Sequence, residues 1–427
     1  LDGGNVTRGL AARCDVLTIP HNPNLGGGEG LIPPLFYDPA DTEEAAKRAA
    51  FEPLVEIYQD KGSSECRWDP RFQRGVETSD EFCSFELLDT RSLLAASGIG
   101  GVSTSSAIPP TDFNPRSQVR NVLKDGLVLA EQYGGVNPFK LGIVASSDHH
   151  NGVMGWHPED ASWPGHLGIE DVRPTRSAGT IQNSSGGHSV VWAEENSRDS
   201  IFEALKRKET YGTSGTRPIV RFFGGWGFDD GLCATNFVPT GYEDGVPMGG
   251  DLPARPPGAG GPRFVAAAWM DDFVGTPLEQ IQIVKGWVAP DGTTQEKVVR
   301  IAGIPGDPRH PEAGVTQSCE ALPPFGAEQL CAVWEDPDFD PAQRAFYYVR
   351  VLERPVCRYS TLICQQQFGL NLFDLEQCEQ DLAAMQAAGD PRAVSAAACC
   401  SDQTTVPIVQ PAIQERAWTS PIWFTPS

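Results

Sequence analysis

An aspartate and two histidines follow directly after an apolar segment in the first half of the chain. The apolar residues 141–145 change abruptly into two serines and then into Asp148, His149 and His150. Because side chains alternate along an extended backbone, Asp148 and His150 can point to one side, with His149 turned away. A carboxylate and an imidazole on one face suit a divalent transition-metal ion. The segment predicts two metal ligands, with His149 as a packed or supporting residue.

A third histidine has the same setting upstream. Residues 16–19 are apolar and lead into Pro20, His21 and Asn22. If both segments are parallel strands of a barrel, their carboxyl ends meet on one face, where such folds build their sites. His21 is therefore a further candidate ligand. Asn22 either orients His21 or is an ordinary turn asparagine.

Two more ionisable residues lie between these segments. Residues 54–59 are predicted to form a strand that carries Glu56, and Lys61 follows just after it. Both are candidate catalytic residues: the Glu56 carboxylate can reach the site, and Lys61 can neutralise an anionic substrate. Strand periodicity equally allows Glu56 to point outward, and Lys61 can equally be a solvated surface residue.

Helical patterns alternate with these strands. A helix is predicted over residues 41–50 with Asp41 as its cap, and a second over residues 117–134 with Ser117 as its cap. A third helix follows a capping Ser197. The alternation predicts an α/β barrel over residues 1–220. Residues 221–427 instead carry short strands between Pro, Gly and Asp clusters, which predicts a β-sandwich. A cysteine-rich insertion with one helix is expected at about residues 355–412.

Composition excludes some classes of function. A net charge of −23 argues against nucleic acid as a partner, because nucleic acid binding needs a basic face. No apolar run approaches the roughly 18 residues of a membrane span. Eleven cysteines, none in a C-x-x-C pair, predict a disulfide framework in an exported, periplasmic or extracellular protein. The adjacent Cys399 and Cys400 are expected to bond to two different partners.

Three stretches together resemble one bacterial family. These are SSDHH, IPHN and the long segment from Val190 to Trp226. They resemble the family of unknown function DUF3604. This family is placed near the polymerase-and-histidinol-phosphatase (PHP) metal hydrolases. The resemblance implies a distorted (β/α)7 barrel that holds two or three divalent ions, zinc, manganese or iron, at its mouth. It also implies that His21, Asp148 and His150 are metal ligands.

The chain departs from the PHP pattern at its beginning. PHP-like domains open with a strand that ends in H-x-H, and no H-x-H occurs among the seven histidines here. We therefore expect the first part of the barrel to be missing from this chain and to act as its partner segment. The hypothesis is a metal-dependent hydrolase that activates water to cleave a phosphoester or another ester bond. The alternative is a non-catalytic exported binding or surface protein on a degenerate scaffold.

Overall fold

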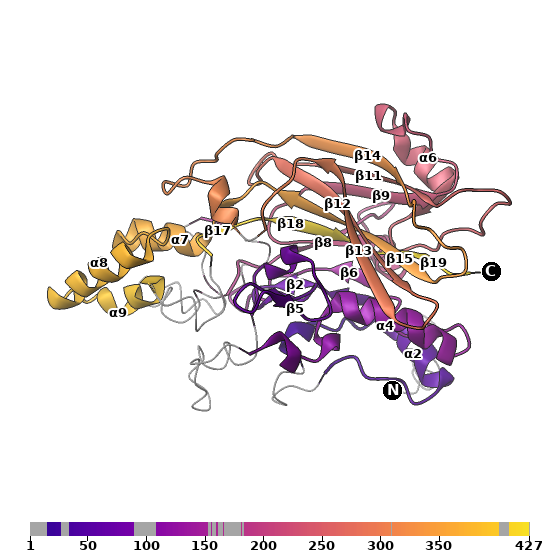
Figure 1. Cartoon of the computed structure of the whole chain (residues 1–427), viewed down its shortest axis with the longest axis horizontal. Helices are drawn as coiled ribbons and strands as arrows, with labels where there is room; N and C mark the ends of the chain where they lie inside the picture. Colours follow the sequence, from indigo (N-terminus) through magenta and orange to yellow (C-terminus); the bar gives the residue numbers. More distant parts are fainter. Residues whose placement is uncertain are drawn as a thin grey trace.

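Two antiparallel sheets and a smaller parallel part make up most of the molecule (Figure 1). The computed structural model describes residues 15–26, 34–88, 108–152, 155, 159–160, 165, 181, 183–308, 310–400 and 410–426. The larger sheet has the strand order β13 (Thr294–Gly303), β12 (Leu278–Val288), β15 (Ala345–Glu353), β18 (Arg416–Thr419), β8 (Thr210–Thr213) and β7 (His188–Val191), and β19 (Ile422–Phe424) also pairs with β15. The smaller antiparallel sheet has the order β10 (Gly245–Pro247), β9 (Ile219–Gly225), β11 (Arg263–Trp269) and β14 (Gln329–Glu335).

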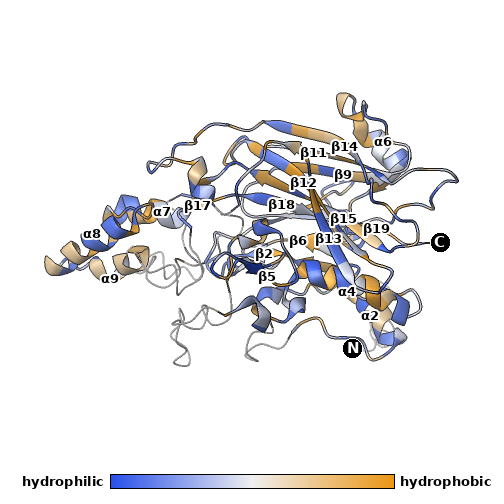
Figure 2. Ribbon diagram, viewed as in Figure 1, coloured by the Kyte–Doolittle hydropathy of each residue, from blue (hydrophilic) through white to orange (hydrophobic). Residues whose placement is uncertain are grey.

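The two antiparallel sheets share one apolar core. Phe222 and Phe264 from the smaller sheet pack in one cluster with Ile283 and Tyr347 from the larger sheet. The Phe264 and Tyr347 rings lie 4.5 Å apart between centroids. Figure 2 shows apolar residues along the strands of both sheets. Burial of these side chains, at about 25 cal/mol per Å² of apolar surface, drives the packing of the two layers.

The strands expected after residue 221 are present, and some strands of the larger sheet come from before it. β7 and β8 belong to that sheet although they precede the predicted boundary, and the boundary itself falls within β9. The division into two domains and the β-sandwich stay predictions. The long-range pairing of β8 with β18 shows that residues on both sides of the boundary fold into one sheet.

The parallel part contains the candidate residues. β1 (Leu54–Glu56) pairs in parallel with β6 (Gly142–Val144). β8 crosses close to β6, where a Cβ atom on Gly212 would lie 2.9 Å from the Ala145 Cβ. Among the residues that the structure describes, no barrel is closed. The complete (β/α)7 barrel therefore stays a prediction.

Three helices of the first 210 residues were expected, and two have the expected caps. α2 (Thr42–Phe51) begins after Asp41, whose side chain accepts from the Glu44 amide, and α5 (Arg198–Lys206) begins after Ser197, which accepts from the Ser200 amide. α4 (Val119–Gln132) begins one residue later than expected, after Gln118. The prediction that Ser117 caps this helix was wrong. Ser117 instead ends the 3-10 turn η4 (Pro115–Ser117), and its hydroxyl donates to the Asn114 carbonyl.

The cysteine-rich insertion is helical and extends from the sheets (Figure 1). It contains α7 (Tyr359–Ile363), the π-helical turn η8 (Cys364–Phe368), α8 (Leu375–Ala387), α9 (Ala393–Ala396) and η9 (Ala397–Cys400), between the paired strands β16 (Val356–Cys357) and β17 (Ala412–Ile413). Cys399 bonds to Cys364, and Cys400 bonds to Cys378. The expectation that the adjacent cysteines have different partners is confirmed.

Five disulfides link ten of the eleven cysteines. The other three bonds are Cys66–Cys83, Cys233–Cys331 and Cys319–Cys357, and Cys14 lies outside the described residues. Disulfides persist in oxidising compartments, so this framework fits a non-cytoplasmic protein. Separately, no helix in the described ranges has the length and apolarity needed to cross a bilayer.

Short elements complete the described chain. They are η1 (Pro23–Leu25), β2 (Tyr58–Gln59), β3 (Gly62–Ser63), β4 (Trp68–Asp69), β5 (Arg74–Gly75), η2 (Glu81–Ser84), η3 (Pro110–Asp112), η6 (Leu232–Ala234), α6 (Phe237–Glu243) and η7 (Pro311–Gly314). The hairpins β2–β3 and β4–β5 follow β1, with Glu65 between them and Asp80 after the second, and these two residues connect the parallel part to the larger sheet.

A buried charge network makes that connection. Arg120 on α4 and Arg350 on β15 are both fully buried, and both pair with Glu65 and Asp80. The Tyr348 hydroxyl and the Trp418 indole also donate to Glu65. Burial opposes ionisation, but the two arginines hold the pKa of Glu65 far below its ordinary value. The network therefore holds ionised groups from distant parts of the chain together.

Candidate functional site

The strands β1 and β6 run in the same direction, and residues 16–20 lie against β1. Beyond the β1–β6 pairing, the Ile57 amide donates to the Val144 carbonyl over 2.8 Å, and the Ser146 amide donates to the Tyr58 carbonyl over 3.0 Å. On the other side of β1, the Glu56 amide donates to the Pro20 carbonyl over 3.0 Å. The segment that begins at residue 16 was expected to be a strand. Residues 16–20 make this hydrogen bond to β1 but have no regular strand structure. The three segments bring most of the predicted site residues to the same edge.

Asp148 is the centre of the site. Lys61 donates a hydrogen bond to Asp148 Oδ2, and His150 Nε2 lies 3.2 Å from Asp148 Oδ1. Partial burial opposes ionisation of Asp148, but the hydrogen bond and charge of Lys61 outweigh it, so its pKa lies below the ordinary value. Asp148 is therefore an ionised carboxylate at neutral pH, with one oxygen toward an ammonium and the other toward an imidazole.

The backbone at this point differs from the expected extended chain. Asp148 has a φ of 56°, in the left-handed region that aspartate tolerates better than most residues. Asp148 and His150 nevertheless lie side by side, 3.2 Å apart, and the two neighbouring histidines have opposite environments. His149 is 6% exposed, whereas the His150 side chain is 57% exposed. A turn, rather than strand alternation, separates the two imidazoles.

Glu56 points inward. Its side chain is buried, Ser146 donates a short hydrogen bond to Oε2, and Oε1 has no hydrogen-bond partner within the described chain. Burial is the main cause that raises the pKa of Glu56 above its ordinary value. The nearby charge of His21 acts in the opposite direction, and that of Asp148 acts in the same direction. Glu56 therefore lies within electrostatic reach of both candidate ligands.

Lys61 is not a solvated surface residue. Its side chain is 15% exposed, and its ammonium lies 3.3 Å from Asp60 Oδ1 and 3.4 Å from Gln59 Oε1, besides its contact with Asp148. Asp60, which is fully buried, was missed by sequence reasoning. Its position directly after a predicted strand was the signal that could have found it. Ser146, the partner of Glu56, was similarly hidden among ordinary small residues.

His21 and Asn22 lie at the rim. His21 is exposed and lines a shallow pocket with Ile19, Leu35 and Glu52. Asn22 has a φ of 54° and precedes η1. Its side-chain oxygen is buried and makes no hydrogen bond to any residue that the structure describes. No contact in these ranges shows Asn22 orienting the His21 ring, so that role stays a prediction.

The donor atoms fit a metal ion only in part. An ionised Asp148 beside His150 offers a carboxylate and an imidazole, two donors that suit a divalent ion. However, Lys61 holds one oxygen of Asp148. In the described ranges, donors from three residues come within 4.8 Å of one another only at Cys66, Asp80 and Cys83. His21, Asp148 and His150 therefore do not form one compact set of ligands.

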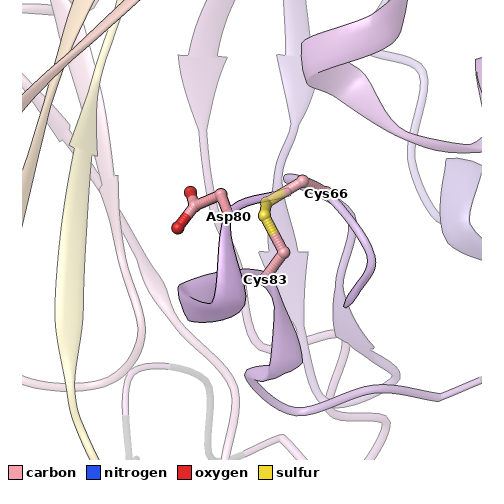
Figure 3. A group of neighbouring side chains, drawn as sticks. All are labelled: Cys66, Asp80 and Cys83. Carbon is pink, nitrogen blue, oxygen red and sulfur yellow. A yellow bond between two sulfur atoms is a disulfide. The ribbon is translucent and has the colours of Figure 1, made fainter. Parts of the chain in front are cut away.

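The group around Cys66 is not a metal site. Figure 3 shows the two sulfur atoms joined in a disulfide, with the Asp80 carboxylate turned aside. Metal binding needs thiolates, which a disulfide does not offer. Asp80 is also paired with Arg120 and Arg350. Asp80 therefore belongs to the buried charge network rather than to a metal site.

Comparison with known proteins gives one match. The family model described as "Protein of unknown function (DUF3604)" matches residues 7–382, which include the parallel part, both antiparallel sheets up to β16 and part of the insertion. No curated protein and no solved structure matches the chain.

Proposed function

The chain belongs to the DUF3604 family of proteins of unknown function, and we propose that it is an exported metal-dependent hydrolase. The proposal places its site at the edge where Glu56, Lys61, Asp148 and His150 meet. The observation that carries it is the ionised Asp148 in contact with His150 at the end of a parallel strand. The resemblance of the family to PHP metal hydrolases supports it as a likeness of sequence, and leaves the substrate open.

In this proposal Asp148 and His150 would hold a divalent ion, and His21 would become a further ligand only by moving toward them, because the three do not form one compact set. A divalent ion supplies a water of lowered pKa and polarises the ester oxygen under attack. Glu56 is suited to accept a proton, because burial raises its pKa toward neutrality and Ser146 holds its other oxygen. Lys61 is suited to neutralise negative charge on a phosphoester or carboxylic ester. His149 and Asn22 would support the ligands.

Substitution of the two proposed metal ligands, Asp148 and His150, tests the proposal. We expect Asp148→Asn and His150→Gln each to weaken zinc or manganese binding by about tenfold or more, because each removes a direct donor. Metal content after dialysis measures binding, and hydrolysis of p-nitrophenyl phosphate and p-nitrophenyl acetate measures activity. His310→Gln is the matched control, since His310 is exposed and lies 3.0 Å from the Glu312 carboxylate. Full metal retention in both site variants would contradict the proposal.

The second candidate is a non-catalytic binding protein. It is favoured by the ion pair between Lys61 and Asp148, which supplies a counter-charge from within the chain. If Lys61 replaces a metal in this way, Lys61→Met should create metal binding that the wild-type protein lacks. If the protein is a hydrolase, Lys61→Met should lower kcat by about tenfold or more through loss of charge stabilisation. Parallel metal titrations and rate measurements on both proteins separate these results.

A further inference from the structure

A second pocket, separate from the candidate metal site, has four acidic residues in its wall. The pocket has a volume of about 220 Å³ and is lined by Glu159, Asp160, Thr216, Val274, Thr276, Glu353, Val356 and Glu415. Glu353 ends β15, and Glu415 immediately precedes β18. The Glu353 amide donates to the Glu415 carbonyl over 2.9 Å, so neighbouring strands place these two residues side by side. This volume is below the roughly 300–1,000 Å³ of drug-sized ligand sites, so the pocket suits only a molecule of a few heavy atoms.

Hydrogen bonds hold the three glutamate carboxylates in place but do not neutralise them. Thr216 donates to Glu353 Oε1, and the Thr276 amide donates to Glu353 Oε2 over 2.9 Å. Ser214 donates to Glu415 Oε2. Glu159 accepts from the Ser185 hydroxyl and from the Tyr359 amide. All of these donors are uncharged, so each carboxylate keeps whatever charge its protonation state gives it.

One buried oxygen remains without a partner. Glu415 is 2% exposed, and its Oε1 atom makes no hydrogen bond to any part of the chain that the structure describes. The neighbouring Arg416 guanidinium interacts with Glu415 only through its charge, because it donates its hydrogen bonds to the Gln414 and Phe82 carbonyls, over 3.3 and 2.9 Å. Burying a carboxyl oxygen without a partner is costly, so this wall of the pocket is suited to a positively charged donor.

We propose that this pocket binds a small organic ammonium ion, with its nitrogen toward Glu353 and Glu415 and its alkyl part against Val274 and Val356. A bare metal ion fits less well. Calcium lies 2.3–2.6 Å from each of its oxygen ligands, which places those oxygens within about 5 Å of one another. Donors from three of these acidic residues do not come within 4.8 Å of one another in the described ranges. The inference does not depend on the proposed hydrolase function.

Binding of such a cation should increase with pH. Burial raises the pKa of Glu353 to about 7, with Asp271 adding to the effect and the hydroxyl and amide donors of Thr216 and Thr276 opposing it. Burial and the charges of Glu159, Glu353 and Glu86 raise the pKa of Glu415. Burial and the charge of Glu86 raise the pKa of Glu159, and the charge of Arg358 opposes this rise. Because only ionised carboxylates attract the cation, affinity should rise by about tenfold or more from pH 5.5 to pH 8.

The experiment is calorimetric titration of the full chain with n-butylamine and with 1,4-diaminobutane. We expect saturable binding near pH 8, at least tenfold weaker binding at pH 5.5, and no binding of butyrate. Glu353→Gln should weaken amine binding about tenfold or more, because it removes one charge and keeps a similar shape. Unfolding curves of each variant show whether the fold is retained.

A surface variant tests the site without touching the buried carboxylates. Val274 is 50% exposed at the pocket, so Val274→Arg adds a competing cation there. We expect it to weaken amine binding at least tenfold, whereas Val394→Arg, at a residue that is 80% exposed on α9, should not. Binding of calcium but of neither amine would overturn the choice of ligand. Absence of amine binding near pH 8, or equal loss in both arginine variants, would overturn the site.

Discussion

Replacement of Arg350 by methionine is expected to lower the free energy of unfolding by about 3–5 kcal/mol. Arg350 is fully buried, and its guanidinium donates to both oxygens of Glu65, over 3.1 and 3.2 Å, and to Asp80 over 2.8 Å. Methionine fills a similar space but leaves the two carboxylates with fewer charge partners. The loss reflects the cost of buried, incompletely paired carboxylates and exceeds the net contribution of the intact ion pairs.

Urea unfolding at neutral pH measures this effect, and its pH dependence identifies the cause. Arginine charge lowers the pKa values of both Glu65 and Asp80 in the folded protein despite their burial. Their contribution to stability is therefore complete above the ordinary carboxyl pKa and declines as the pH falls below it. The Arg350→Met variant should show a weaker decline, because the shift depends on the arginine. Arg300→Met, which removes an exposed arginine on β13, is the control and should leave the unfolding midpoint unchanged.

Equal stability of wild type and Arg350→Met would contradict this account of the network. So would a loss of stability that is the same at pH 4 and pH 7, because such a loss would come from packing alone. The matched change Arg120→Met separates the two sides of the network, since Arg120 pairs with the same carboxylates from α4.

Removal of the Cys233–Cys331 disulfide is expected to cost about 4–5 kcal/mol. The bond joins η6 to β14 across 98 residues of sequence. A cross-link that closes a loop of about 100 residues removes much conformational entropy from the unfolded chain, and its loss returns that entropy. Urea unfolding of the double variant Cys233→Ala/Cys331→Ala measures the effect without leaving a free thiol.

The Cys378–Cys400 bond provides the comparison. It spans only 22 residues, so Cys378→Ala/Cys400→Ala should cost about 3 kcal/mol by the same relation. The order of the two losses is the test, because both variants remove two buried or half-buried sulfur atoms. A larger loss for the shorter loop would show that local packing within the insertion, rather than chain entropy, determines the value of these bonds.

Local patterns in the sequence determined many of the elements. The caps at Asp41 and Ser197 and the strands β11, β12 and β15 were readable because hydrogen bonding at helix ends and burial on strands act over a few neighbouring residues. The separate partners of Cys399 and Cys400 followed from covalent geometry. Placement of Asp148 and His150 on one side was also predicted, from strand alternation, whereas the structure brings the two together with a left-handed backbone at Asp148.

Only the tertiary structure decided which charges meet. The Lys61 ammonium reaches Asp148 across 87 residues of sequence, and Arg350 reaches Glu65 across 285. The carboxylates of Glu353 and Glu415 become neighbours through the pairing of β15 with the chain before β18. Such contacts depend on strand order and on how deeply each group is buried, and neither is encoded in residue spacing. The sequence by itself therefore determined most of the elements and the two neighbouring ligand candidates. Long-range strand pairing determined the ionisation of Asp148, the burial of Glu56 and the acidic pocket. The physical reason is that charge interactions act through space rather than along the chain.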